Sequence, residues 1–203
     1  MTIAKTQFNR KNILISGGLA VGGPQTHVTI LCKFLRAAGL NVTIAATASN
    51  MEPFEIEALR KLGVRVLVPK LGFGRFKWIG TLQCLITWPF VLPRRFDTLY
   101  CIGHGKMHLF CLRFLHDGGK AIYHEIVQCP KPDSTAAAVA ARMNSLVGNS
   151  RKVSSELRLL YPSLPVTTIP FLTAEGEMPT PVRKSKTLTG TINVAFFLSL
   201  IHI

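Results

Sequence analysis

The sequence predicts an α/β fold with an open parallel sheet covered by helices on both faces. Short apolar runs suited to buried strands alternate with longer stretches of helical period, which is the pattern of parallel strands joined by helical crossovers. The composition agrees, because 48% of the 203 residues are hydrophobic and only 17% are charged. We therefore expect one domain with a substantial core rather than a disordered chain.

The first predicted unit is a strand, a glycine-rich loop and a helix. Residues 12–16 form the expected strand, and four glycines lie within residues 17–23. The apolar residues of the following stretch, 24–38, are spaced to line one face of a helix. A glycine loop between a strand and a helix commonly brings backbone N–H groups close to a phosphate.

The alternation of strands and helices continues to residue 169. Several of these elements are bounded by glycine or proline. The further expected strands cover residues 41–45, 64–68, 97–102, 120–124, 146–147 and 166–169, and the further expected helices cover residues 53–62, 106–116, 134–142 and 151–160. We expect about six or seven parallel strands in one sheet.

The glycine loop does not match two common phosphate-binding patterns. A dinucleotide site needs G-x-G-x-x-G and an acidic residue near the end of the second strand, but the glycines at 17, 18, 22 and 23 lack this spacing. No acidic residue lies between Thr26 and Glu52, and no Gly-Lys-Ser/Thr follows the loop. A nicotinamide-dependent enzyme therefore stays only an alternative, and no tightly bound cofactor is expected.

The net charge of +14 favours anionic partners. Basic residues outnumber acidic ones by 24 to 10, which suits nucleic acid, an anionic membrane surface or phosphorylated substrates. The basic residues are scattered and lack an aromatic-rich sheet motif, so nucleic acid is not the expected partner. A nonenzymatic basic module for nucleic acid or anionic lipid remains an alternative.

The cysteine pattern indicates reduced thiols and a cytoplasmic protein. The five cysteines are odd in number and form no Cys-x-x-Cys pair, so we expect mostly buried thiols. The basic N-terminal stretch is interrupted by Gly17 and Gly18, which leaves no convincing signal peptide.

Histidines provide the candidate chemistry. His104 and His108 lie four residues apart, but Gly105 stands where a metalloprotease requires glutamate, so no metal site is expected. His124 closes the predicted strand 120–124. A lone histidine more often has a structural role, which stays the alternative here. Ligands collect at the carboxyl ends of parallel strands, so the position of His124 raises the case for a functional role.

An uncharged stretch covers residues 78–93. It is shorter than the ~20 residues of a membrane-spanning helix, and we expect a buried or interfacial helix instead. The basic residues Arg75, Lys77, Arg94 and Arg95 flank it, interleaved with aromatic residues that include Trp78. This pattern is typical of a peripheral edge that contacts an anionic membrane or the acceptor, and a solvated rim around a core helix is the alternative.

Several segments resemble one enzyme family. Gly22-Gly23-Pro24-Gln25-Thr26-His27-Val28 and the stretch 35–43 resemble the opening of retaining GT-B glycosyltransferases. That group includes the phosphatidylinositol mannosyltransferases and many lipopolysaccharide and capsule enzymes. Further similar stretches lie at 97–100, 147–150 and 166–170, and the resemblance runs from about residue 12 to residue 197.

The resemblance implies a Rossmann-like domain that binds the acceptor, with a nucleotide-sugar donor held by a second domain. It implies that His124 lies near the transferred sugar, where an imidazole would help stabilise an oxocarbenium-like transition state. Substrate binding is implied for Gly22, Gly23, Gln25, His104 and Glu125. The reaction would transfer a sugar with retention to a lipid-linked, glycan or small-molecule acceptor, in the cytoplasm or on the inner face of its membrane.

The resemblance also divides the chain. Residues 1–172 form the expected acceptor-binding domain, 173–191 an interdomain linker, and 192–197 the first strand of a truncated second domain. Residues 198–203 depart from the family pattern and match a translation of CTG TCT CTT ATA CAC ATC, a transposon end used in sequencing libraries. We expect this tail to be non-native and the natural reading frame to continue into the second domain.

Overall fold

The computed structural model describes residues 11–17, 19, 23–47, 53–69, 77–92, 95–103, 105–125 and 134–170. The strands are β1 (Asn12–Gly17), β2 (Asn41–Ala45), β3 (Arg65–Leu67), β4 (Phe96–Ile102), β5 (Leu115–Glu125), β6 (Ser145–Gly148) and β7 (Val166–Thr168). The helices are α1 (Gly23–Ala37), α2 (Pro53–Lys61), α3 (Lys77–Val91), α4 (Met107–Cys111), α5 (Thr135–Ala140) and α6 (Arg151–Leu160), with a 3-10 turn at Leu112–Phe114. Each strand and helix expected between residues 12 and 169 has a counterpart.

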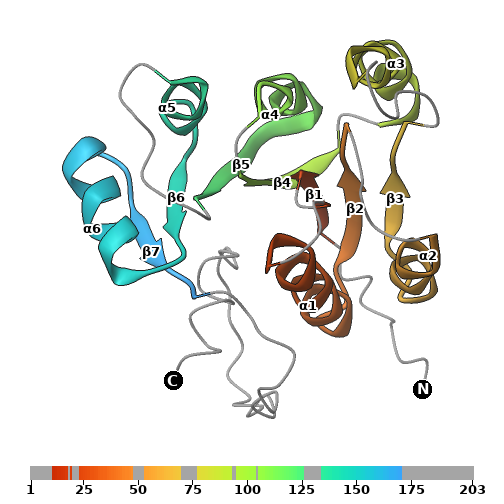
Figure 1. Cartoon of the computed structure of the whole chain (residues 1–203), viewed down its shortest axis with the longest axis horizontal. Helices are drawn as coiled ribbons and strands as arrows, with labels where there is room; N and C mark the ends of the chain where they lie inside the picture. Colours follow the sequence, from red (N-terminus) through yellow and green to blue (C-terminus); the bar gives the residue numbers. More distant parts are fainter. Residues whose placement is uncertain are drawn as a thin grey trace, which may run out of the picture.

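The strands form one sheet of seven, all parallel, in the order β3-β2-β1-β4-β5-β6-β7. The chain moves outward from β1 to β3, crosses back over the sheet through α3, and then moves outward from β4 in the opposite direction. Figure 1 shows α1 and α2 on one face of the sheet and α3, α4 and α5 on the other. The predicted α/β fold, an open Rossmann-like sheet with helices on both faces, is confirmed.

Two hydrophobic layers hold the helices to the sheet, because successive strand residues point to opposite faces. On one face, Val28 and Leu35 of α1 join a cluster with Ile13 and Ile15 of β1. On the other face, a second cluster contains Leu14 of β1 and residues from α3, α4, α5 and α6. Its helical members include Cys84, Trp88, Cys111, Val139, Val153 and Leu157. The uncharged stretch around α3 is thus anchored to the core along one side.

Strand β5 begins earlier than the sequence predicts. The expected helix 106–116 ends at Cys111, and β5 starts at Leu115 rather than at residue 120. Phe96 of β4 pairs with Leu115, but Thr98 pairs with Lys120, so extra residues of β5 bulge out between these two pairs. The bulged residues are polar and glycine-rich and show no apolar alternation, which is why the sequence hides this part of the strand.

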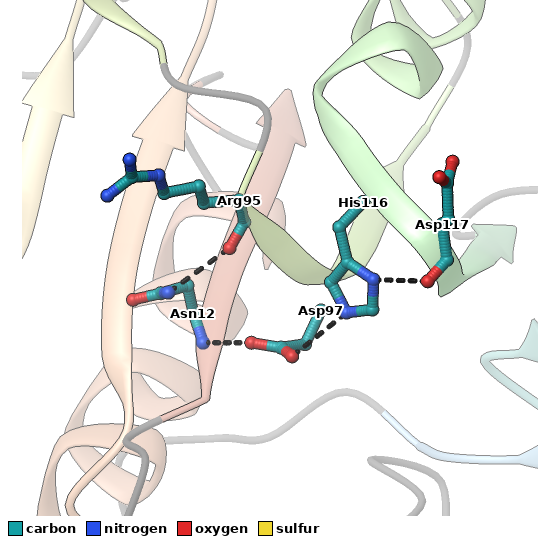
Figure 2. A network of polar contacts seen from close by, with 5 residues as sticks. All are labelled: Asn12, Arg95, Asp97, His116 and Asp117. Carbon is teal, nitrogen blue, oxygen red and sulfur yellow. Dashed lines mark hydrogen bonds and ion pairs between the residues drawn. The ribbon is translucent and has the colours of Figure 1, made fainter.

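A polar network ties three strands together at the amino-terminal edge of the sheet (Figure 2). The backbone N–H of Asn12 donates to Oδ2 of Asp97 over 2.7 Å, and Nε2 of His116 lies 3.1 Å from Oδ1 of the same carboxylate. The side-chain amide of Asn12 donates to the carbonyl oxygen of Arg95 over 3.1 Å. These contacts join the starts of β1, β4 and β5 at the edge opposite the predicted ligand site.

Four of the five cysteines fall within the described ranges, and all four are buried and outside any disulfide. Burial raises the pKa of Cys32 to about 12 and the pKa of Cys84 and Cys111 to about 11. These thiols therefore act as apolar core groups, as the sequence predicts. Cys129 lies outside the described residues.

Candidate functional site at the carboxyl edge of the sheet

The strand register brings the start of the glycine loop and the predicted catalytic histidine to the same edge. Gly17, the last residue of β1, pairs with Ile102 of β4, and Ile102 pairs with His124 of β5. Since neighbouring strands lie about 4.8 Å apart, Gly17 and His124 are about 10 Å apart across the sheet. Gly17 and His124 thus lie at the same edge of the sheet. The expectation that Gly22 and Gly23 share this edge with His124 stays a prediction, because Gly22 lies outside the described residues.

On the α1 side of this edge, three side chains form a buried aromatic and polar cluster. His27, in the first turns of α1, meets the ring of His124 edge to face, with 4.8 Å between the ring centroids. The hydroxyl oxygen of Tyr100 lies 2.9 Å from Nδ1 of His124. His27 and His124 are fully buried and Tyr100 is 1% exposed. The cluster thus connects α1, β4 and β5.

The electrostatics of the cluster favour neutral imidazoles. Burial lowers the pKa of His27 from 6.5 to about 4. Burial also lowers the pKa of His124 well below 6.5, the nearby His27 lowers it further, and a hydrogen bond with the Ile169 backbone acts in the opposite direction. Both rings are therefore uncharged at neutral pH. They can donate or accept hydrogen bonds but carry no positive charge.

On the opposite face of the same edge, His108 of α4 holds the end of β1. Its Nε2 lies 2.9 Å from the carbonyl oxygen of Gly103, and its Nδ1 lies 2.8 Å from the hydroxyl oxygen of Ser16. Because a carbonyl only accepts, Nε2 donates to Gly103, and in a neutral ring Nδ1 then accepts from the Ser16 hydroxyl. His108 thus fastens the strand end from which the glycine loop leaves.

Gly17 is required by this arrangement. Its φ is +87°, and a Cβ at this position would lie 2.6 Å from the Ile102 carbonyl oxygen and 3.2 Å from Cε1 of His108. An L side chain is disfavoured at this φ, and the neighbouring backbone leaves no room for one. The glycine therefore serves close strand and helix packing at the start of the loop.

Glu125, which the resemblance assigns to substrate binding, is fully buried at the end of β5. One of its oxygens, Oε2, accepts a hydrogen bond from the Tyr123 hydroxyl over 2.7 Å. The ring of Tyr123 in turn lies near His108, with 6.5 Å between centroids. Glu125 and His124 adjoin in sequence but face opposite sides of the sheet, so they belong to two separate clusters.

The other predicted site residues divide into described and undescribed positions. Gly23 begins α1, and the side chain of Gln25 donates to the carboxylate of Glu55 on α2. Trp78 is exposed on α3, and Arg95 is exposed just before β4, at the sheet edge opposite His124. Outside the described residues lie Gly22, Arg75, Arg94, His104 and the predicted segments 173–191, 192–197 and 198–203, and the side chain of Lys77 is likewise undescribed.

The sequence alone predicts no role in the site for His27, Tyr100, Ser16 or His108. The sequence does contain a signal for Tyr100 and His27. Tyr100 lies on the same strand face as Ile102, two residues before the strand end, and His27 lies one helical turn after Gly23, so both are near the ends of their elements. Within the described ranges, no group of three or more His, Cys, Asp or Glu side chains could hold a metal ion. No described helix is both long enough and apolar enough to cross a membrane.

Comparison of the sequence with protein-family models and with curated proteins finds no match. Comparison of the structure with solved structures does find similar proteins. A crystal structure of a glycosyltransferase from Rickettsia africae ESF-5 aligns with 80% of this chain, at 15% sequence identity and a TM-score of 0.51. The chain shares its fold with part of a glycosyltransferase. It spans 43% of the length of that protein, less than half of it.

Proposed function

We propose that this chain is the acceptor-side domain of a glycosyltransferase that moves a sugar from a nucleotide-sugar donor to a lipid-linked, glycan or small-molecule acceptor with retention of configuration. The observation that carries the proposal is the shared fold: four fifths of the chain aligns with a glycosyltransferase. The family resemblance of the glycine-loop segment points the same way and adds the retaining GT-B type. Fold alone does not define chemistry, so the site must supply the rest.

The cluster at the carboxyl edge supports a positioning role for His124 in this reaction. Its Nδ1 lies 2.9 Å from the Tyr100 hydroxyl and its ring packs on His27, so two neighbours hold the ring in one orientation. Preorganised hydrogen-bonding groups stabilise developing charge without reorganising during the reaction. We propose that His124 is a neutral member of such a group beside the transferred sugar. The protonated form of His124 is disfavoured there, because burial lowers the pKa of its imidazole.

Donor binding is proposed to reside in a second domain. The chain covers 43% of the neighbouring glycosyltransferase, and basic groups that would hold a nucleotide diphosphate are expected in the remainder. In this proposal no resident cofactor or metal takes part, and the nucleotide sugar is a substrate. The 203-residue chain alone should then bind nucleotide sugars weakly and transfer no sugar.

The test starts from genomic DNA amplified across codon 197. The protein encoded by the complete reading frame would be incubated with radiolabelled UDP- and GDP-hexoses and an extract containing lipids and glycans. We expect label in the lipid or glycan fraction, and an anomeric configuration in the product that matches the donor. Replacing His124 by Gln should lower transfer by about 100-fold, a loss typical of removing a preorganised catalytic hydrogen-bonding group.

The matched control is His116→Gln, which changes a histidine at the opposite edge of the sheet and should leave transfer unchanged. Tyr100→Phe should give an intermediate loss, because it removes one constraint on the His124 ring. The proposal is wrong if the genomic frame stops after residue 203 and the chain transfers no sugar. Transfer unaffected by His124→Gln would reject the role of His124 alone.

A further inference from the structure

Helix α3 has a buried face and an exposed apolar face. Cys84, Trp88 and Leu92 pack into the core with 1–3% exposure. On the other side, large apolar residues recur at i, i+4, i+7, i+8 and i+12, which places them on one face of the helix. These residues and their exposed fractions are Trp78 62%, Leu82 46%, Leu85 39%, Ile86 58% and Phe90 87%.

This gathering of exposed apolar side chains is specific to α3. With Val91, the helix holds six of the ten large hydrophobic residues that are exposed in the described parts of the chain. The other four are divided between α2 with its following turn and α6. Single exposed hydrophobic residues are ordinary, but a contiguous patch marks an interaction surface.

The charged residues in the sequence stretch that contains α3 are of one sign. No charged residue lies between Trp78 and Leu92, and the sequence from 68 to 96 contains no acidic residue. The basic residues of that stretch are Lys70, Arg75, Lys77, Arg94 and Arg95. Figure 2 shows the guanidinium of Arg95 directed away from Asp97. A further cation, Arg113, lies 5.0 Å from the ring centroid of Phe110, whose ring neighbours Trp88 of α3.

We propose that the exposed face of α3 docks on an anionic membrane surface. Trp78 and Phe90 lie about 18 Å apart along the helix and would enter the headgroup region together, while Arg95 contacts lipid phosphates. The charge decides between occupants. A second copy of this chain would bring cations against cations, whereas an anionic bilayer complements them. The proposal does not depend on the proposed sugar transfer.

Vesicle co-sedimentation of the 203-residue chain tests the proposal. Vesicles of phosphatidylcholine would be compared with vesicles that also contain phosphatidylglycerol, at low and high salt. We expect binding to the anionic vesicles, weaker binding at high salt and little binding to the neutral vesicles. No binding to anionic vesicles at low salt overturns the proposal.

Matched variants locate the docking face. Phe90→Ser should weaken vesicle binding by about fivefold or more, since burial of one aromatic side chain is lost. Phe54→Ser is the control, because Phe54 is 72% exposed on α2, on the opposite face of the sheet. Arg95→Gln should weaken binding about fivefold, and Lys152→Gln on α6 should not. Equal effects of Phe90→Ser and Phe54→Ser would reject α3 as the docking element.

Tryptophan fluorescence provides an independent reading. The protein has two tryptophans, and Trp88 is 3% exposed while Trp78 is 62% exposed. Anionic vesicles should therefore shift the emission of Trp78 to shorter wavelength, and the shift should be absent in Trp78→Phe, which retains Trp88. If Phe90→Ser instead abolishes a concentration-dependent dimer and vesicles leave the emission unchanged, the face joins two copies of the chain and the proposal is wrong.

Discussion

The ring of His27 meets the ring of His124 edge to face at an interplanar angle of 70°, and both rings are completely buried. One ring comes from the helix that follows the glycine loop and the other from the central part of the sheet. Protonating either ring would bury a positive charge beside the other ring. The folded state therefore requires both imidazoles to be neutral.

Lowering the pH should destabilise the protein already at pH values above those at which carboxylates titrate. The unfolded chain binds protons at His27 and His124 below about pH 6.5, whereas folded His27 binds one only near pH 4. Stability is thus fully present above pH 6.5 and falls as the pH is lowered. At pH 5 the titration of His27 alone should lower the free energy of unfolding by about 2 kcal/mol. Urea unfolding at pH 5 and pH 7.5 measures the difference.

The variant His27→Gln should flatten this dependence, since it removes one of the two titrating rings. A pH dependence between 5 and 7 that is identical in the wild type and in His27→Gln would contradict the prediction. His116→Gln is the useful comparison, because the pKa of His116 is raised rather than lowered and its effect has the opposite sign.

Replacing Gly17 by Ala should destabilise the fold by about 3 kcal/mol or more. The substitution combines an unfavourable φ of +87° with a contact of 2.6 Å between the new Cβ and the Ile102 carbonyl oxygen. Gly39→Ala is the matched control: its φ is +80°, but nothing lies within 4 Å of the new Cβ. The control should cost only about 1 kcal/mol. Denaturant unfolding of both variants separates the steric contact with Ile102 from the backbone strain. Equal losses of unfolding free energy in the two variants would show that the contact with Ile102 adds nothing.

Ser16→Ala should cost about 1–3 kcal/mol, because it deletes the hydroxyl that donates to Nδ1 of buried His108. The matched control is Ser155→Ala, whose hydroxyl donates to the Arg151 carbonyl over 2.9 Å on an exposed helical face. That change should be neutral, since alanine has the higher helix propensity and water replaces the lost bond. Thermal unfolding of both variants provides the measurement. A neutral Ser16→Ala would show that His108 does not depend on this bond.

The exposed pair at the opposite edge should titrate in the reverse sense. Hydrogen bonds with the Asp117 backbone and with Asp97 raise the pKa of His116 above 6.5. Because the folded pKa is raised, the pair stabilises the fold below pH 6.5, and this contribution is lost as the pH rises through the folded value. NMR titration of His116 in the wild type and in Asp97→Asn tests this. The variant should show a lower pKa, and high salt should lower it in the wild type.

The sequence predicted the elements of the sheet well because most strands carry their own local signal. Residues 41–45 form an apolar run after a glycine stop, and β2 covers the same residues. The first part of β5 carries no such signal. Residues 116–118 are polar and exposed, and only pairing with β4 makes them part of a strand. Non-local pairing of this kind is invisible to periodicity.

The candidate site was partly predictable for a similar reason. His124 could be placed at the carboxyl edge from the strand order alone, since parallel strands end together. Its burial and its contacts with His27 and Tyr100 depend on how α1 packs over the sheet, and spacing in the sequence contains no measure of that. The same limit applies to Glu125, whose burial beside Tyr123 follows from its alternation to the opposite face.

The two outermost strands of the described sheet, β3 and β7, have three residues each. An edge this short offers few unpaired backbone groups to another chain, and β3 also carries the exposed side chain of Arg65. A longer apolar edge strand would be an aggregation hazard in a chain so rich in hydrophobic residues. The tapering of the described sheet toward both sides thus limits the backbone that another chain could pair with.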